Sequence, residues 1–185
     1  PEFGRSVLEV LRKPLEEKKI VVSRARYSVE YPANFTLVAA MNPCPCGYYN
    51  HPTKECTCSP GSVHRYMGRI SGPLMDRIDL HVEVTPVTPQ ELSAAAPGEA
   101  SAAVRERVIR ARAVQEARFG GVEGVHTNSM MNSAMLREYC RLDAASAALL
   151  ERAMERLSLS ARAYDRIRKA ARTIADLAGR ADIVQ

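Results

Sequence analysis

The chain has 185 residues, of which 46% are hydrophobic, and it carries a formal net charge of +5 with a pI near 9.1. This composition is ordinary for a globular protein and supplies enough apolar residues for a real core. The chain contains no apolar run of about 18 residues or more, which excludes a transmembrane helix, and its first residues lack the layout of a signal peptide. We therefore expect a cytoplasmic protein with no membrane partner. The positive charge permits a polyanionic partner without demonstrating one.

The N-terminal segment, residues 4–18, predicts an amphipathic helix, because Val7, Leu8, Leu11 and Leu15 recur at helical spacing. Pro14 lies inside this pattern and should kink the helix or end it nearby. The next two runs, residues 20–23 and 27–31, are rich in β-branched and aromatic residues. With a short polar connection between them, they predict a β-hairpin.

Two later segments predict buried strands. Residues 35–40 form a nearly continuous apolar run of strand length, which suits the centre of a parallel sheet. A second strand is predicted at residues 79–84, where Pro86 and Pro89 close it off. Between them we expect a loop at 42–61, a short helix at 62–70 and a tight segment at 71–77.

The second half of the chain predicts helices. After a linker at 94–98, a long helix at 99–119 ends at Gly120 and Gly121, and three more helices follow at 132–142, 143–157 and 160–178. Asp143 and Ser160 are good N-cap residues, and Gly179 suits the position after a helix end. The fold class is therefore α/β, with a sheet-containing part at residues 1–92 and an all-helical part at 93–185.

Four of the five cysteines lie within one short loop, in the pattern C-x-C, nine residues, C-x-C. They are Cys44, Cys46, Cys56 and Cys58. In a chain without a secretory signal, such clustering indicates a metal site rather than disulfides. Four thiolates can close a tetrahedral zinc site, with His51 and His64 as reserve ligands. The alternative is four reduced cysteines with no metal.

Several motifs together carry a family resemblance. They read LVAAMNPCPCG, CTCSP, RISGPLMDRIDLHVEV and LSARAYDRIRKAARTIADLAG. The chain resembles, over nearly its whole length, the AAA+ ATPases of the magnesium-chelatase-like competence family (ComM/YifB type). This resemblance implies the C-terminal half of an AAA+ core, with parallel sheet strands and a β-hairpin, followed by an α-helical lid. No G-x-x-x-x-G-K-[ST] motif occurs in the chain, so the Walker A and Walker B motifs would lie upstream of PEF.

The resemblance also implies roles for individual residues. Asn42 matches the sensor 1 position, which orients the attacking water or contacts the γ-phosphate. The alternative is an asparagine that caps a turn before Pro43. Arg77 matches the arginine finger, which stabilises charge on the nucleotide of a neighbouring subunit. An ion pair with Asp76 or Asp79 is the alternative, and Arg69 is the second candidate for the finger.

In the predicted lid, Arg162 matches the sensor 2 position, which contacts nucleotide, and Arg166 is its neighbour one turn on. A solvated helix face is the alternative for both. The hairpin matches an insertion that points into the pore of related rings. There Arg24 and Arg26 would contact DNA phosphates without reading sequence, unless the hairpin is an ordinary surface feature.

The function that this resemblance implies is ATP hydrolysis, with Mg²⁺, in a homo-oligomeric ring that is expected to be a hexamer. The work of such a ring would be DNA remodelling, of the branch-migration or helicase kind, on single-stranded or branched DNA. This chain alone is expected to be inactive. Two alternatives stay open: the motor subunit of a metal chelatase, and a zinc-bound interaction module.

Overall fold

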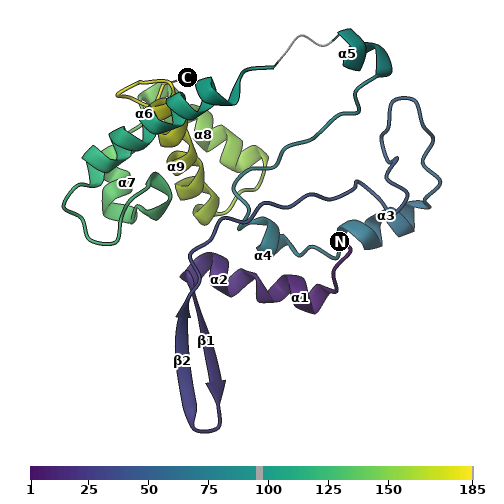
Figure 1. Cartoon of the computed structure of the whole chain (residues 1–185), viewed down its shortest axis with the longest axis horizontal. Helices are drawn as coiled ribbons and strands as arrows, with labels where there is room; N and C mark the ends of the chain where they lie inside the picture. The colour runs from purple at the N-terminus through teal and green to yellow at the C-terminus, as the bar shows by residue number, and fades with distance from the viewer. Residues whose placement is uncertain (95–97, 185) are drawn as a thin grey trace. The chain divides into compact units, whose positions relative to one another are not determined.

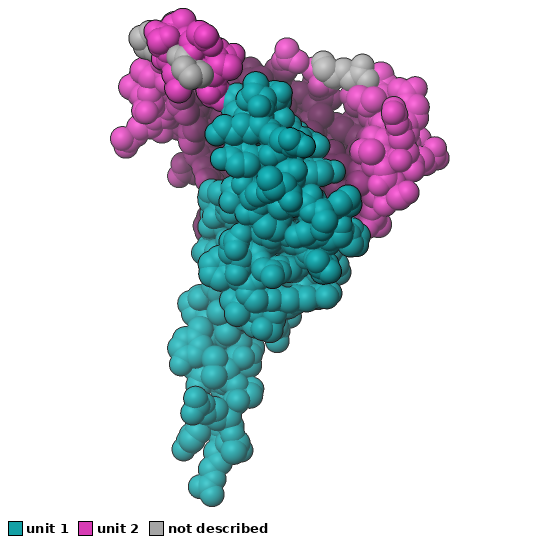
Figure 2. Space-filling view, turned by 90° about the vertical axis from the view of Figure 1, so that its right-hand side faces the viewer, with its two compact units in different colours: residues 1–86 teal, residues 87–185 magenta. Residues whose placement is uncertain are grey.

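The computed structural model describes residues 1–94 and 98–184, and the chain divides into two compact units, Pro1–Pro86 and Val87–Gln185. Figure 2 distinguishes the two units by colour, and each is described by itself. The predicted boundary at residue 92 stays a prediction. Most of the predicted linker falls on residues 95–97, which lie outside the described residues.

The first unit begins with two short helices, α1 (Arg5–Val10) and α2 (Arg12–Glu17), where the sequence predicts one (Figure 1). The break at Leu11 follows from Pro14, which confirms the predicted kink. Proline cannot donate a hydrogen bond to the carbonyl of Val10, four residues back, and its ring crowds that oxygen. The chain leaves α2 through Lys18, which has a left-handed conformation with a φ of 57°.

The predicted hairpin is confirmed as β1 (Lys19–Arg24) and β2 (Tyr27–Pro32), an antiparallel pair joined by a two-residue turn. In Figure 1 the two strands extend away from the other elements of the first unit. At the base of the hairpin, the N–H of Ala33 donates to the carbonyl of Lys18 over 2.7 Å. This bond ties the end of β2 to the end of α2.

The predicted parallel strands at 35–40 and 79–84 are wrong for this chain. Among the described residues, β1 and β2 make up the whole sheet, and neither predicted segment forms a strand. Apart from Leu37, the residues of both segments are exposed, with Val38 at 89% and Val82 at 81%. A strand exists only where a neighbouring strand accepts and donates its backbone hydrogen bonds. No described segment does so here.

Two helices complete the first unit, α3 (Pro60–Met67) and α4 (Gly72–Met75), and α3 overlaps the helix predicted at 62–70. Each is capped by a serine one residue before it: the Ser59 hydroxyl accepts from the N–H of Ser62, and the Ser71 hydroxyl from that of Leu74. Each cap satisfies an N–H that the first helical turn leaves unpaired.

The second unit is helical, as predicted. Its elements are α5 (Pro89–Ala94), α6 (Ser101–Phe119), the 3-10 helix η1 (Asn128–Met130), α7 (Ser133–Tyr139), α8 (Ala144–Arg156) and α9 (Ala161–Leu177). Asp143 and Ser160 cap α8 and α9, and Gly179 follows α9 with a φ of 67°, so all three predictions are confirmed. The sequence does not predict α5.

The apolar core of the second unit lies where α7 and α9 meet the end of α6. Its buried residues are Phe119, Met131, Leu136, Cys140, Ala175 and Ile183. A polar network accompanies this core and centres on Asp176, whose side chain is 0% exposed. Arg118 donates two hydrogen bonds to its carboxylate, at 2.6 and 2.7 Å, and Asn128 and Arg172 donate one each. The buried charge is therefore fully compensated.

Candidate functional site

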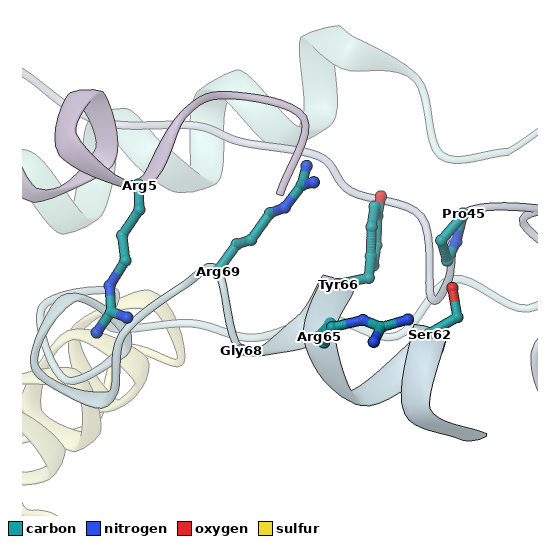
Figure 3. Close-up of a pocket in the computed structure, with 7 residues that line it drawn as sticks. All are labelled: Arg5, Pro45, Ser62, Arg65, Tyr66, Gly68 and Arg69. Carbon is teal, nitrogen blue, oxygen red and sulfur yellow. The ribbon is translucent and has the colours of Figure 1, made fainter. Parts of the chain in front are cut away.

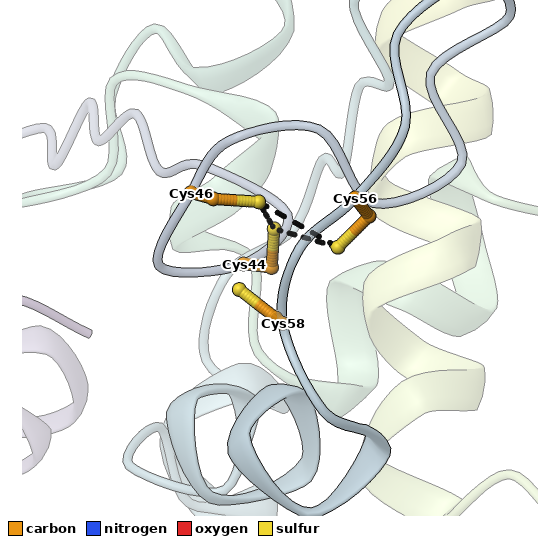
Figure 4. A group of neighbouring side chains, drawn as sticks. All are labelled: Cys44, Cys46, Cys56 and Cys58. Atoms are coloured by element: carbon orange, nitrogen blue, oxygen red, sulfur yellow. Dashed lines mark hydrogen bonds between the residues drawn. The ribbon is translucent and has the colours of Figure 1, made fainter.

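The four predicted cysteines come together in the loop that precedes α3 (Figure 4). All four Sγ atoms lie within 4.8 Å of one another. The pairs Cys44–Cys46, Cys46–Cys56 and Cys44–Cys56 are separated by 3.4, 3.6 and 3.8 Å. A disulfide needs about 2.05 Å, so the cysteines are unbridged. Zinc bound tetrahedrally at about 2.3 Å from each sulfur would place the sulfurs about 3.8 Å apart, so the arrangement fits a metal ion.

Backbone groups around the cluster favour thiolates. The N–H of Tyr49 donates to the Cys44 sulfur over 3.3 Å. A backbone hydrogen bond from Tyr48 is the largest influence on Cys46, and with further hydrogen bonds it lowers the pKa of that thiol to about 5 against the effect of burial. Gly47 allows the backbone to turn between Cys46 and Tyr48, because its φ of 83° is easily adopted only by glycine.

The other thiols resist ionisation in the absence of a cation. A backbone hydrogen bond from Cys58 favours the Cys56 thiolate, but burial and the neighbouring sulfurs outweigh it and raise the pKa of Cys56 to about 12. A negative charge on one sulfur thus disfavours ionisation of the neighbouring thiol. A divalent cation would remove this conflict. The reserve ligands lie outside the cluster, and His51 Nδ1 instead accepts from the N–H groups of Thr53 and Lys54.

Asn42 lies directly before this loop, and its side chain is exposed. A backbone hydrogen bond joins Asn42 to the hydroxyl of Tyr66, which in turn donates to Glu2 over 3.0 Å. Because the strand predicted before Asn42 does not form, the structure leaves its predicted sensor role untested.

Arg77 follows α4 and is held by two groups of its own chain. Its Nη1 donates to the carbonyl of Pro73 over 2.6 Å, and its Nη2 donates to the carboxylate of Glu16 in α2. The side chain is 11% exposed. Sequence reasoning weighs Asp76 and Asp79 as ion-pair partners for Arg77 and misses Glu16, because no local pattern connects residues 61 positions apart.

Arg69 lines a basic pocket of about 410 Å³ beside α3 (Figure 3). Arg5 and Arg65 also line it, together with Ser62, Tyr66, Pro45 and Gly68. In Figure 3, Arg65 extends toward Ser62, whereas Arg5 and Arg69 extend in different directions from it and from each other. Arg69 Nη1 donates to the carbonyl of Pro1 over 2.8 Å. The three arginines make the lining of this pocket basic.

The remaining predicted residues lie apart from these. Arg24 ends β1, Arg26 lies in the turn, and both side chains are exposed at the tip of the hairpin. Arg162 and Arg166 lie in the first turns of α9, in the second unit. The structure therefore groups the cysteines with Asn42, and Arg77 with Glu16. Arg162 and Arg166 belong to the second unit, which is described by itself.

Comparison with known proteins identifies the class. The family model of magnesium chelatase subunit ChlI matches residues 1–92, and that of the ChlI C-terminal region matches residues 98–185. The chain belongs to this magnesium-chelatase-like family. Among the described residues, no helix is long and apolar enough to span a membrane.

Within the family, similar proteins include competence protein ComM of Haemophilus influenzae, with 46% identity over all of this chain and 35% of ComM. YifB of Escherichia coli, an uncharacterized protein, is 43% identical over 96% of this chain and 34% of its own length. An uncharacterized protein of Mycobacterium tuberculosis is 40% identical over 97% of this chain and 35% of its own length. The chain thus spans about a third of the length of these curated relatives.

Proposed function

We propose that the chain is the C-terminal part of an AAA+ ATPase that uses ATP and Mg²⁺ to remodel DNA in a cytoplasmic homo-oligomeric ring. Its family and its similarity to a competence protein support this proposal. On this proposal, the exposed segments 35–40 and 79–84 pair with further strands of the AAA+ core in the complete protein. Residues 98–184 then form the lid.

The observation that carries the DNA part of the proposal is the hairpin. Apart from Lys19, all of its residues are exposed, so it stands free of the first unit instead of packing on it. Arg24 and Arg26 lie at its tip. A projecting arm with a basic end suits contact with the phosphate backbone of a threaded strand, which needs charge and reach but no reading of bases.

The nucleotide roles follow the family pattern. Asn42 orients water or γ-phosphate, Arg77 acts on the nucleotide of the neighbouring subunit, and Arg162 or Arg166 contacts nucleotide from the lid. In the Cys44/Cys46/Cys56/Cys58 cluster we propose a structural zinc. Bound there, zinc would supply charge neutralisation and would staple a loop that has little apolar packing of its own.

The separating experiment uses the full-length protein and changes Arg24 and Arg26 together to alanine. DNA binding should weaken evenly across sequences, and the salt dependence of log K should become shallower by roughly 1.5 units, at about 0.7–0.9 units per lost phosphate contact. Basal ATP turnover should persist, whereas stimulation by DNA should fall. Arg152→Ala with Arg156→Ala in α8 is the matched control, because it removes the same charge from another exposed surface.

An unchanged salt slope with undiminished stimulation by DNA would contradict the role of the hairpin and make it an ordinary surface feature. ATP turnover that DNA does not stimulate even in the wild type would favour the metal-chelatase motor that the family name suggests. A second candidate function rests on the cysteine cluster alone: a zinc-bound interaction module in which hydrolysis is incidental. Loss of ATP turnover in an Arg77→Ala variant that still binds nucleotide would exclude that module.

A further inference from the structure

Glu16 gives the guanidinium of Arg77 a contact of full opposite charge, and it comes from a distant part of the chain. We propose that Glu16 is a positioning residue that holds Arg77 in the geometry of an arginine finger. This inference rests on the proposed function, in which Arg77 acts on the nucleotide of a neighbouring subunit.

The need for positioning follows from the arginine side chain itself. An unrestrained arginine loses rotamer entropy when it is fixed, and this loss would otherwise raise the free energy of the transition state. In the structure the loss has already occurred, because the Arg77 side chain is 11% exposed and both of its terminal nitrogens are engaged. An arginine finger that is fixed before the reaction lowers the activation free energy, because its side chain no longer loses rotamer entropy in the transition state.

The two contacts hold the guanidinium and leave some of its N–H donors available for a ligand. Arginine has five N–H donors, and the Pro73 carbonyl and the Glu16 carboxylate take one from each terminal nitrogen. The two terminal nitrogens can therefore still offer a bidentate fork to phosphate oxygens. Pro73 belongs to α4, four residues before Arg77, so its carbonyl holds Nη1 from the same stretch of chain. Glu16 lies in α2 and fixes the direction of the charged end.

The test compares ATP turnover of the full-length protein carrying Glu16→Ala with the wild type. We expect kcat to fall about 10–100-fold, as for a misplaced catalytic group, whereas Arg77→Ala should cost about 10³-fold or more. The KM for ATP should change little, because the finger acts in the transition state. Glu16→Gln keeps an acceptor oxygen at the same reach and should recover part of the loss.

Glu17→Ala is the matched control. Glu17 is the next residue of α2, it is 43% exposed like Glu16, and its ion pair is with Lys13. Its removal should leave kcat within about twofold, since exposed pairs contribute little. A structural role for Glu16 would instead lower thermal stability by the same amount with or without Arg77.

A double-mutant cycle decides the matter. If Glu16 acts through Arg77, Glu16→Ala should have no further effect on kcat in an Arg77→Ala background. Additive losses, an unchanged kcat or a raised kcat for Glu16→Ala would each overturn the inference. These results differ from a failure of the proposed function, in which Arg77→Ala itself leaves ATP turnover intact.

Discussion

Replacing Cys56 with serine tests the metal centre most directly. The wild-type chain, made and kept reduced with zinc, should hold one zinc ion per chain by elemental analysis. Three of the sulfurs are separated by 3.4, 3.6 and 3.8 Å, and the fourth, of Cys58, lies within 4.8 Å of each of them. These separations are close to the spacing of about 3.8 Å that four sulfurs have around a zinc ion bound at about 2.3 Å. X-ray absorption should therefore report four sulfur neighbours at that distance.

The energetic effect should be local to the loop. Structural zinc contributes folding free energy on the order of 10 kcal/mol in small zinc domains, so the loop should lose most of its order when a ligand is lost. Cys56→Ser should lower the zinc content and speed tryptic cleavage after Lys54, which lies exposed in the same loop. Cys140→Ser is the control, since that thiol belongs to the core of the second unit and its loss should leave one zinc per chain.

Two outcomes would refute this reasoning. Zinc content near zero in fully reduced protein, with all four loop thiols freely titratable, would leave reduced cysteines without a metal. A zinc site that survives Cys56→Ser but not His51→Ala would show that the ligand set is different from the one the geometry indicates.

Three further predictions concern the rest of the chain. Asp176→Ala should lower the free energy of unfolding of the second unit by about 3–5 kcal/mol in urea, because it removes the buried carboxylate that compensates the charges of Arg118 and Arg172. In contrast, Asp165→Ala should cost less than about 1 kcal/mol, because the Asp165 side chain is 44% exposed and its ion pair with Arg168 is long, at 4.0 Å. Burial raises the pKa of Asp176, but hydrogen bonds from Arg118 and Asn128 and the nearby arginine charges lower it more, so its net pKa is below the ordinary value. Its stabilising contribution should be complete above about pH 4 and fade as the pH falls further; an unchanged gap between wild type and Asp176→Asn from pH 7 to pH 3 would argue against this. Finally, the purified chain alone should show no magnesium-dependent ATP turnover in a phosphate-release assay. ATP turnover that Asn42→Ala abolishes would overturn the expectation that hydrolysis needs Walker A and Walker B motifs outside this sequence.

Local features of the fold could be predicted because local chemistry determines them. The hairpin follows from two β-branched runs and a short turn, the kink follows from Pro14, and the helix ends follow from Asp143, Ser160 and Gly179. The cysteine cluster could also be found, since four ligands in one short loop need no distant partner.

Features that depend on distant partners could not be predicted. The apolar runs at 35–40 and 79–84 satisfy every local rule for a buried strand, yet strand formation depends on neighbours that the described residues do not supply. The pairing of Arg77 with Glu16 likewise cannot be predicted from periodicity or from a motif, because it joins α2 to the segment after α4. The polar network around Asp176 joins three separate elements for the same reason.

The bond between Ala33 and Lys18 gives the hairpin the mechanics of a lever. Each strand has six residues, which at about 3.3 Å per residue makes an arm of roughly 20 Å. Since both strands are fastened at the end of α2, a sideways load on the arginines at the tip becomes a torque on that helix. Glu16 lies in the last turn of α2, two residues before the pivot at Lys18. A displacement of the tip therefore acts on the end of the helix that carries the carboxylate holding Arg77.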